Sequence, residues 1–130
     1  IMKKLIIVLL LGVVLSFVPS SSIKYVRAEE PTEEPAPLEY VYQFADKYSV
    51  NAGVMIKIIN CENAEWDPKL QSRIVKNGIR EKSWGLVQIH LPSHPQITKA
   101  QATDPRFSIE FLANMLSKGK GKLWTCFSMV

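Results

Sequence analysis

The chain has 130 residues, of which 16 are basic and 12 acidic, and its formal net charge is +4. This length accommodates one domain of ordinary size. Four basic residues and no acidic residue lie in residues 1–28, so residues 29–130 hold 12 of each and are neutral. The neutral balance and the absence of a known nucleic-acid-binding motif argue against a protein that binds DNA or RNA.

Residues 1–28 have the layout of a secretory signal peptide. Two lysines follow Met2, an apolar run extends from Leu5 to Leu15, and Val26-Arg27-Ala28 fits a signal peptidase site. A transmembrane helix needs about 20 apolar residues, and this run is shorter. We therefore expect cleavage after Ala28 and a secreted or cell-envelope location. The alternative is an uncleaved amino-terminal anchor, in which case we expect the protein to contact a membrane through this segment alone.

Residues 29–37 are acidic and rich in proline, which predicts an extended linker. They hold four of the 12 acidic residues, so the following domain, residues 38–130, has 12 basic and 8 acidic residues and a net charge of +4. A mildly basic domain suits an anionic polymer as its partner.

The first half of this domain contains two predicted helices. Apolar residues at steps of three and four predict a helix over 38–48. Asn51 is a suitable N-cap for a second helix that runs to about residue 63, with a buried stripe of Val54, Met55, Ile58 and Ile59. A short helix is predicted over 70–75. The pair Asn77-Gly78 predicts a turn.

The second half contains a further helix with clear boundaries. Residues 86–91 are mainly apolar, and their pattern fits a strand or a helix. Thr98 and Gln101 form a predicted capping box, and Asp104-Pro105 predicts the start of a helix. Its expected apolar face comprises Phe107, Phe111, Leu112, Met115 and Leu116. Gly119 to Lys122 would end the helix, so the sequence predicts a small, mainly α domain.

Cys61 and Cys126 are the two cysteines of a chain that we expect to be exported. A disulfide between them is the natural interpretation, and two free buried thiols are the alternative. His90 and His94 have the spacing of a zinc-binding pair on a helix, but Pro92 between them disfavours a helix. We expect neither a metal nor a cofactor.

Glu62 is the candidate acid-base residue, since it follows an apolar helical stretch. A carboxyl group at the end of a buried helix can be desolvated, and desolvation raises its pKa toward the range of a general acid. Taken alone, an exposed surface position is the commoner outcome. Glu65, beside Trp66, competes for the role but lies past the expected helix end.

A second motif spans Ser83 to Ile89. Gly85 permits a tight turn or the close approach of a ligand. Gln88 is a polar amide in an apolar run, so it would hydrogen-bond either a sugar or nearby backbone. Trp84 would stack on a sugar ring or pack in the core.

Together these motifs resemble the lytic transglycosylases of the lysozyme-like superfamily, which includes the goose-type lysozymes. The resemblance extends roughly from Tyr40 to Cys126. It rests on Cys61-Glu62-Asn63, on the run from Asn77 to Ile89 with its Gly85-Leu86-Val87-Gln88, and on the segment from Ala102 to Ala113. Asn63 stands where the family usually has serine, Val87 stands in place of methionine, and the later Ala-Tyr-Asn segment of the family has no match.

The resemblance implies a lysozyme-like fold that acts as a monomer on peptidoglycan glycan strands. Glu62 matches the catalytic glutamate, which protonates the bond between N-acetylmuramic acid and N-acetylglucosamine and then acts as a base. Gln88 and the segment Ser83, Trp84, Gly85 and Leu86 match the substrate cleft. The expected product carries a 1,6-anhydro ring. The alternatives are lysozyme-type hydrolysis, with Glu81 or Asp67 as a second carboxylate, and a catalytically weak peptidoglycan-binding module.

Overall fold

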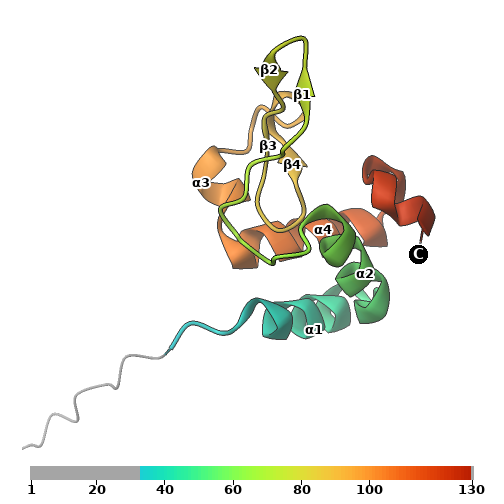
Figure 1. Ribbon diagram of the computed structural model, residues 1–130. Coiled ribbons are helices and arrows are strands. Elements are labelled where there is room, and N and C mark those ends of the chain that lie inside the picture. Colours follow the sequence, from blue (N-terminus) through green and yellow to red (C-terminus); the bar gives the residue numbers. More distant parts are fainter. Residues whose placement is uncertain (1–32, 130) are drawn as a thin grey trace, which may run out of the picture. The chain divides into compact units, whose positions relative to one another are not determined.

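The computed structural model describes residues 33–129 (Figure 1). The predicted signal peptide and residues 29–32 of the predicted linker lie outside the described residues. Residues 33–36 are exposed and have no regular structure, and the first helix begins at Pro37, the last residue assigned to the linker. Proline is favoured at this first helical position because its missing N–H would have no partner there.

The described chain is a small, mainly α domain, as the sequence predicts. Its helices are α1 (Pro37–Tyr48), α2 (Ala52–Glu62), α3 (Lys99–Ala102), α4 (Pro105–Ser117) and the 3₁₀ turns η1 (Leu91–Ser93), η2 (Gly121–Leu123) and η3 (Thr125–Met129). Its strands are β1 (Val75–Lys76), β2 (Ile79–Arg80), β3 (Ser83–Trp84) and β4 (Ile89–His90). Across residues 33–129, no helix combines the length and apolar character that a membrane span requires.

The predicted helix starts are confirmed. The Asn51 side chain accepts a hydrogen bond from the Val54 amide at 3.1 Å. Thr98 and Gln101 form the capping box, and the Asp104 carboxylate accepts from the Phe107 amide at 2.7 Å. Each cap satisfies an amide that the first helical turn leaves without an intrahelical partner.

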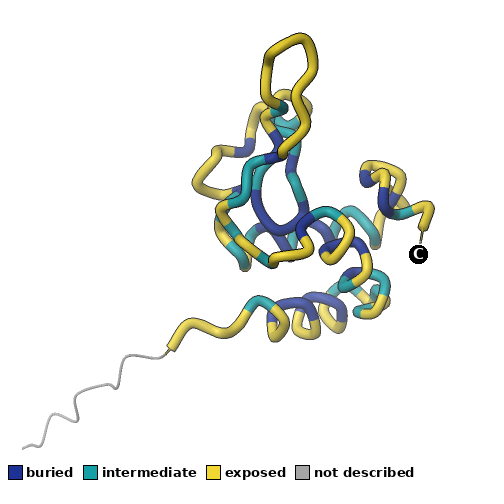
Figure 2. Tube along the Cα trace, viewed as in Figure 1, coloured by how far each residue is buried: buried dark blue, intermediate teal, exposed yellow. Residues whose placement is uncertain are grey.

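The core lies where α1 packs against α4 and α2 (Figure 2). Met55, Ile58 and Ile59 of the predicted α2 stripe are fully buried, whereas Val54 is partly exposed. The predicted apolar face of α4 packs against the core, and Ile109 and Ala113 add to it. The helix buries Ser108, Ile109, Leu112 and Ala113 most deeply, while Phe107, Phe111, Met115 and Leu116 are partly buried at the edge of the core. The reason is that the 83–90 loop also packs on α4 and covers Ser108.

The predicted helix over 70–75 is wrong. This segment is extended, and Gln71 pairs with Trp84 as an antiparallel bridge, followed by a hydrogen bond from the Ser72 amide to the Ser83 carbonyl at 2.9 Å. The backbone groups of 70–75 are therefore satisfied by a distant segment, which removes the need for helical hydrogen bonds.

The Asn77-Gly78 turn is confirmed and joins β1 to β2. Both residues have a positive φ, 52° and 75°, as a tight two-residue hairpin turn requires. Residues 86–91, which fit either a strand or a helix, form a turn that leads into β4. Gly85 cannot be replaced in this turn without a clash, because an added Cβ would lie 1.9 Å from the Ala102 carbonyl oxygen.

The carboxyl-terminal segment is fastened at two points. The predicted disulfide between Cys61 and Cys126 is present and closes a loop of sequence separation 65. The buried Trp124 donates a hydrogen bond from Nε1 to the Val87 carbonyl at 2.7 Å. These contacts hold η3 beside the end of α2, and the disulfide is compatible with an extracellular protein.

Candidate active site

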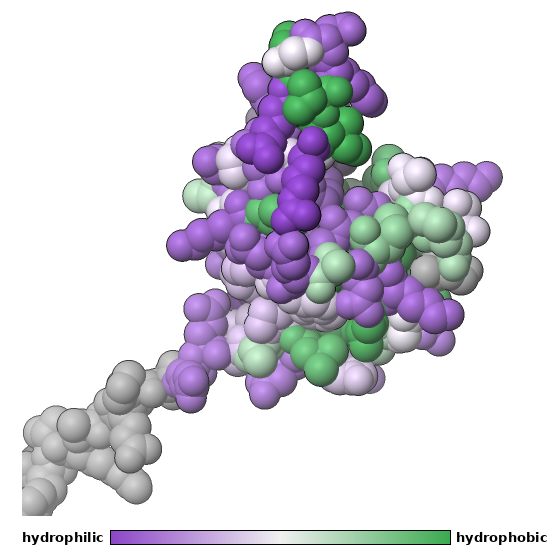
Figure 3. Space-filling model, in the orientation of Figure 1, coloured by the Kyte–Doolittle hydropathy of each residue, from purple (hydrophilic) through white to green (hydrophobic). Residues whose placement is uncertain are grey.

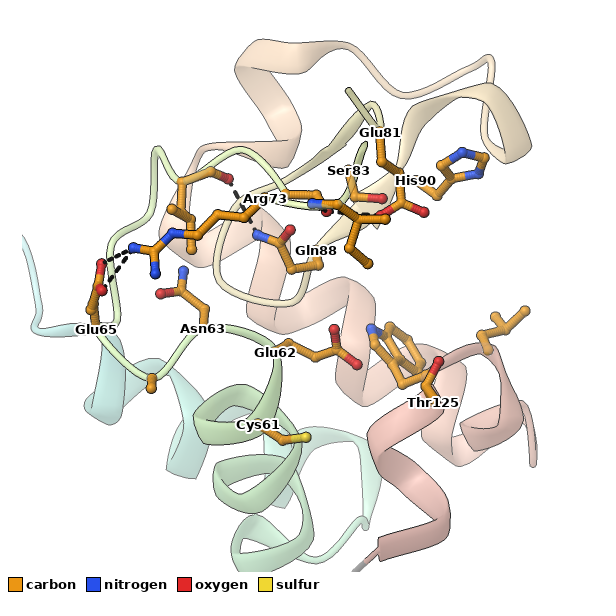
Figure 4. Close-up of a pocket in the computed structure, with 16 residues that line it drawn as sticks. Cys61, Glu62, Asn63, Glu65, Arg73, Glu81, Ser83, Gln88, His90 and Thr125 are labelled. Atoms are coloured by element: carbon orange, nitrogen blue, oxygen red, sulfur yellow. Dashed lines mark hydrogen bonds and ion pairs between the residues drawn. The ribbon is translucent and has the colours of Figure 1, made fainter. Parts of the chain in front are cut away.

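A cleft of about 470 Å³ opens where the end of α2 meets the β strands and the carboxyl-terminal segment (Figure 4). The residues that matter for its chemistry come from separate parts of the chain. They are Glu62, Asn63, Glu81, Ser83, Gln88 and Trp124. The two motifs that the sequence analysis linked thus meet in one place.

Glu62 is the last residue of α2, and its half-buried side chain points into the cleft (Figure 4). Burial raises the pKa of the Glu62 carboxyl above its ordinary value. The Cys126 backbone amide lowers this pKa, and the negative charge of Glu81 raises it. Burial is the largest of these effects, so the group holds its proton to a higher pH than an exposed glutamate does.

Glu81 lies across the cleft from Glu62 (Figure 4). Its carboxylate accepts a hydrogen bond from the Ser72 hydroxyl at 2.8 Å, which fixes its orientation. Of the two residues considered as second carboxylates, Glu81 lines the cleft and Asp67 does not. The Asp67 backbone instead bonds to Asn63.

Asn63 holds the end of α2 to the strands and was not assigned to the site from the sequence. Its side chain is 1% exposed. Nδ2 donates to the carbonyl oxygens of Asp67 at 2.7 Å and Gly85 at 3.3 Å, and Oδ1 accepts from the Asp67 amide at 3.2 Å. Because Asn63 follows Glu62 directly, these bonds position the acid. In the sequence, the position of Asn63 between the end of a helix and an Asp-Pro pair is the signal that could have indicated this positioning role.

Gln88 lines the cleft, and its amide nitrogen is used within the protein. Nε2 donates to the carbonyl oxygens of Gly85 at 2.9 Å and Leu70 at 3.3 Å. The nitrogen therefore satisfies backbone, one of the two roles that the sequence left open. The side-chain oxygen makes no hydrogen bond to the described residues and is placed to accept one from a ligand in the cleft.

The structure separates the other predicted substrate-binding residues into two groups. Ser83 lines the cleft. Trp84, Gly85 and Leu86 do not line it. Leu86 is fully buried in the core, and Lys99 lies over the Trp84 ring at 3.7 Å from its centroid. Side chains in β3 alternate between the two faces, so neighbouring residues cannot both point into the cleft.

Polar residues at the rim have partners of their own. Glu65 is exposed and accepts hydrogen bonds from Arg73 at 2.8 and 3.0 Å. His90 bonds Ser93 through Nδ1 at 2.7 Å, while His94 packs edge-on against Phe111. Within residues 33–129, no group of three or more His, Cys, Asp or Glu side chains is arranged to hold a metal ion.

Comparison with known proteins leaves the family open. No protein-family profile and no solved structure matches the chain. Curated proteins with partial similarity include Maturase K of Phragmites australis and of Oryza sativa, each 28% identical over 81 residues, and Maturase K of Nardus stricta, 27% identical over 81 residues. The match covers 62% of this chain and 15% of each of these proteins. Similarity to so small a part of the relatives assigns the chain to no family.

Proposed function

We propose that this protein is a lysozyme-like enzyme that cleaves the β-1,4 bond between N-acetylmuramic acid and N-acetylglucosamine in peptidoglycan. The observation that carries the proposal is the Glu62 carboxyl, half-buried at the cleft with a raised pKa. A buried acid of this kind can deliver a proton at a pH where an exposed glutamate has lost it. The disulfide and the amino-terminal pattern support action outside the cytoplasm.

In the proposed reaction, Glu62 protonates the glycosidic oxygen as the bond to C1 of the muramoyl residue breaks. The resulting Glu62 carboxylate then takes the proton of the muramoyl 6-hydroxyl as that oxygen bonds to C1. The product is a 1,6-anhydromuramoyl end, and no water is consumed. The Gln88 side-chain oxygen, left free on the cleft wall, would accept a hydrogen bond from a sugar hydroxyl or acetamido group.

Glu81 favours a second outcome, which is hydrolysis. A carboxylate opposite the acid can activate a water molecule on the other face of the sugar, as inverting glycosidases require. Glu81 lines the same cleft as Glu62 and is oriented by Ser72, which supports such a role. The sequence resemblance favours the anhydro product, while the presence of Glu81 in the cleft supports water as the acceptor.

Mass spectrometry of the soluble products released from purified peptidoglycan tests both outcomes. We expect anhydromuropeptides as the main products. Muropeptides with reducing muramic acid ends would instead assign the hydrolytic reaction to the same site. If the protein binds the polymer and releases nothing, the proposed enzyme is wrong and the domain is a peptidoglycan-binding module.

Glu81→Gln is expected to shift the pH dependence of cleavage. The Glu81 charge raises the pKa of Glu62, so its removal lowers that pKa and moves the alkaline limb of the rate profile to lower pH. The shift is partial because burial, the larger effect, remains. The measurement is the pH profile of initial rates for both proteins. An unchanged alkaline limb would contradict the assigned coupling, and a loss of rate at every pH would indicate that Glu81 also activates water.

A further inference from the structure

One face of the β1–β2 hairpin continues the wall of the cleft. Lys76 pairs with Ile79, and the Glu81 amide donates to the Ile74 carbonyl at 2.9 Å. Cross-strand neighbours share a face and side chains alternate along each strand, so Ile74, Lys76, Ile79 and Glu81 lie on one side. Ile74 and Glu81 line the cleft. Ile79 and Lys76 therefore extend the same wall toward the hairpin turn, which projects from the body of the domain (Figure 1).

This extended wall is apolar and exposed. Ile74 is 52% exposed and Ile79 is 70% exposed, and hydrophobic residues gather on the hairpin in Figure 3. Leu123, which also lines the cleft, is 55% exposed. Large aliphatic side chains on both sides of a polar cleft indicate a ligand whose apolar part extends out of the cleft at this point. Lys76 adds a positive charge at the outer end of the wall.

We propose that this wall, formed by Ile74, Ile79 and Lys76, binds the peptide branch of the peptidoglycan strand. The inference rests on the proposed function, since a strand held at Glu62 carries a peptide on its muramic acid. Such peptides present methyl groups, which suit the isoleucines, and free carboxylates, which suit Lys76 in a domain of net charge +4.

A membrane surface fits the hairpin less well. A loop that enters a bilayer does so with apolar residues at its tip. The tip of this hairpin is Asn77-Gly78, which is polar, and the isoleucines lie along its side. The apolar wall also continues from the cleft rather than standing apart from it.

The test compares intact glycan strands with strands whose peptides have been removed by an amidase. We expect Ile79→Ser and Lys76→Gln each to lower kcat/KM on intact strands by roughly three- to ten-fold and to leave the value on bare strands unchanged. Val75→Ser and Lys82→Gln are the matched controls, because both residues are exposed and lie on the opposite face of the hairpin. The controls should behave as wild type on both substrates.

Co-sedimentation separates this inference from the proposed reaction. Glu62→Gln protein, with or without Ile79→Ser, is mixed with intact or amidase-treated cell-wall sacculi. If the Glu62→Gln protein binds intact sacculi in preference to amidase-treated sacculi, and Ile79→Ser removes this preference, the peptide site is supported. This holds even if wild type cleaves neither polymer and the proposed enzyme is wrong. If Ile79→Ser lowers kcat/KM equally on intact and bare strands, the inference is overturned while the proposed enzyme stands. The inference is also overturned if the protein sediments with vesicles of anionic phospholipid, used in place of sacculi, in a way that depends on Ile79.

Discussion

Glu62→Gln is expected to reduce cleavage of peptidoglycan by about 10²- to 10⁴-fold, the usual contribution of a general acid-base residue. Glutamine has the same shape, but it cannot donate an acidic proton or accept one back. The measurement is the rate at which soluble muropeptides are released from purified peptidoglycan. Equal rates for the wild type and the variant would rule out the role assigned to Glu62.

The same substitution is expected to leave the fold intact. Because the pKa of Glu62 is raised in the folded state, the folded protein holds this proton more tightly than the unfolded chain does. The contribution of Glu62 to stability is therefore present at low pH. It is lost as the pH rises from the unfolded pKa through the raised folded pKa. An uncharged glutamine avoids this loss, so the thermal midpoint at neutral pH should be equal to or above that of wild type.

Glu65→Gln is the matched control for Glu62→Gln. Glu65 also lines the cleft, but it is exposed and paired with Arg73 at the rim. We expect its removal to leave most of the activity, because an exposed ion pair contributes little to stability and this carboxylate is not desolvated. A loss as large as that of Glu62→Gln would transfer the catalytic role to Glu65.

Replacing Cys61 and Cys126 by serine together is expected to lower the free energy of unfolding by about 4 kcal/mol, from the loop-closure entropy of a 65-residue separation. Small domains are typically stable by about 5–15 kcal/mol, so the loss is a large fraction of the total. Urea titration followed by tryptophan fluorescence gives the value. As a control, a thiol reductant should lower the wild-type midpoint to that of the variant and leave the variant unchanged. Midpoints that do not respond to the reductant would contradict the prediction.

The disulfide should also affect the chemistry of the cleft. Cys61 precedes Glu62, and the Cys126 backbone amide lowers the pKa of the Glu62 carboxyl. If the bridge is removed and η3 separates from α2, this amide moves away from the carboxyl. Its lowering effect is then lost, and the pKa of Glu62 rises. Activity is measured without denaturant, at a temperature where the serine variant is folded. The alkaline limb of its pH profile should lie at higher pH than that of wild type.

Local signals in the sequence determined the helices and the turn. The caps at Asn51, Thr98 and Asp104 and the glycine of Asn77-Gly78 act within a few residues, so the starts of α2, α3 and α4 and the hairpin turn could be predicted. The Cys61–Cys126 bridge could also be predicted, because the chain holds two cysteines and has an apolar leader pattern. The sequence also singles out Glu62 and Gln88, a carboxylate at the end of an apolar helix and an amide within an apolar run.

The tertiary structure alone decided how these parts meet. Residues 70–75 are extended because they pair with Trp84 and Ser83, a long-range contact that outweighs local helix propensity. The same pairing turns Ser83 toward the cleft and leaves Leu86 in the core, which the motif alone did not distinguish. Glu81 acquires its place opposite Glu62, and Asn63 its bond to Gly85, through this strand arrangement. Periodicity and capping report on neighbours along the chain, whereas the cleft depends on backbone hydrogen bonds between segments far apart in sequence.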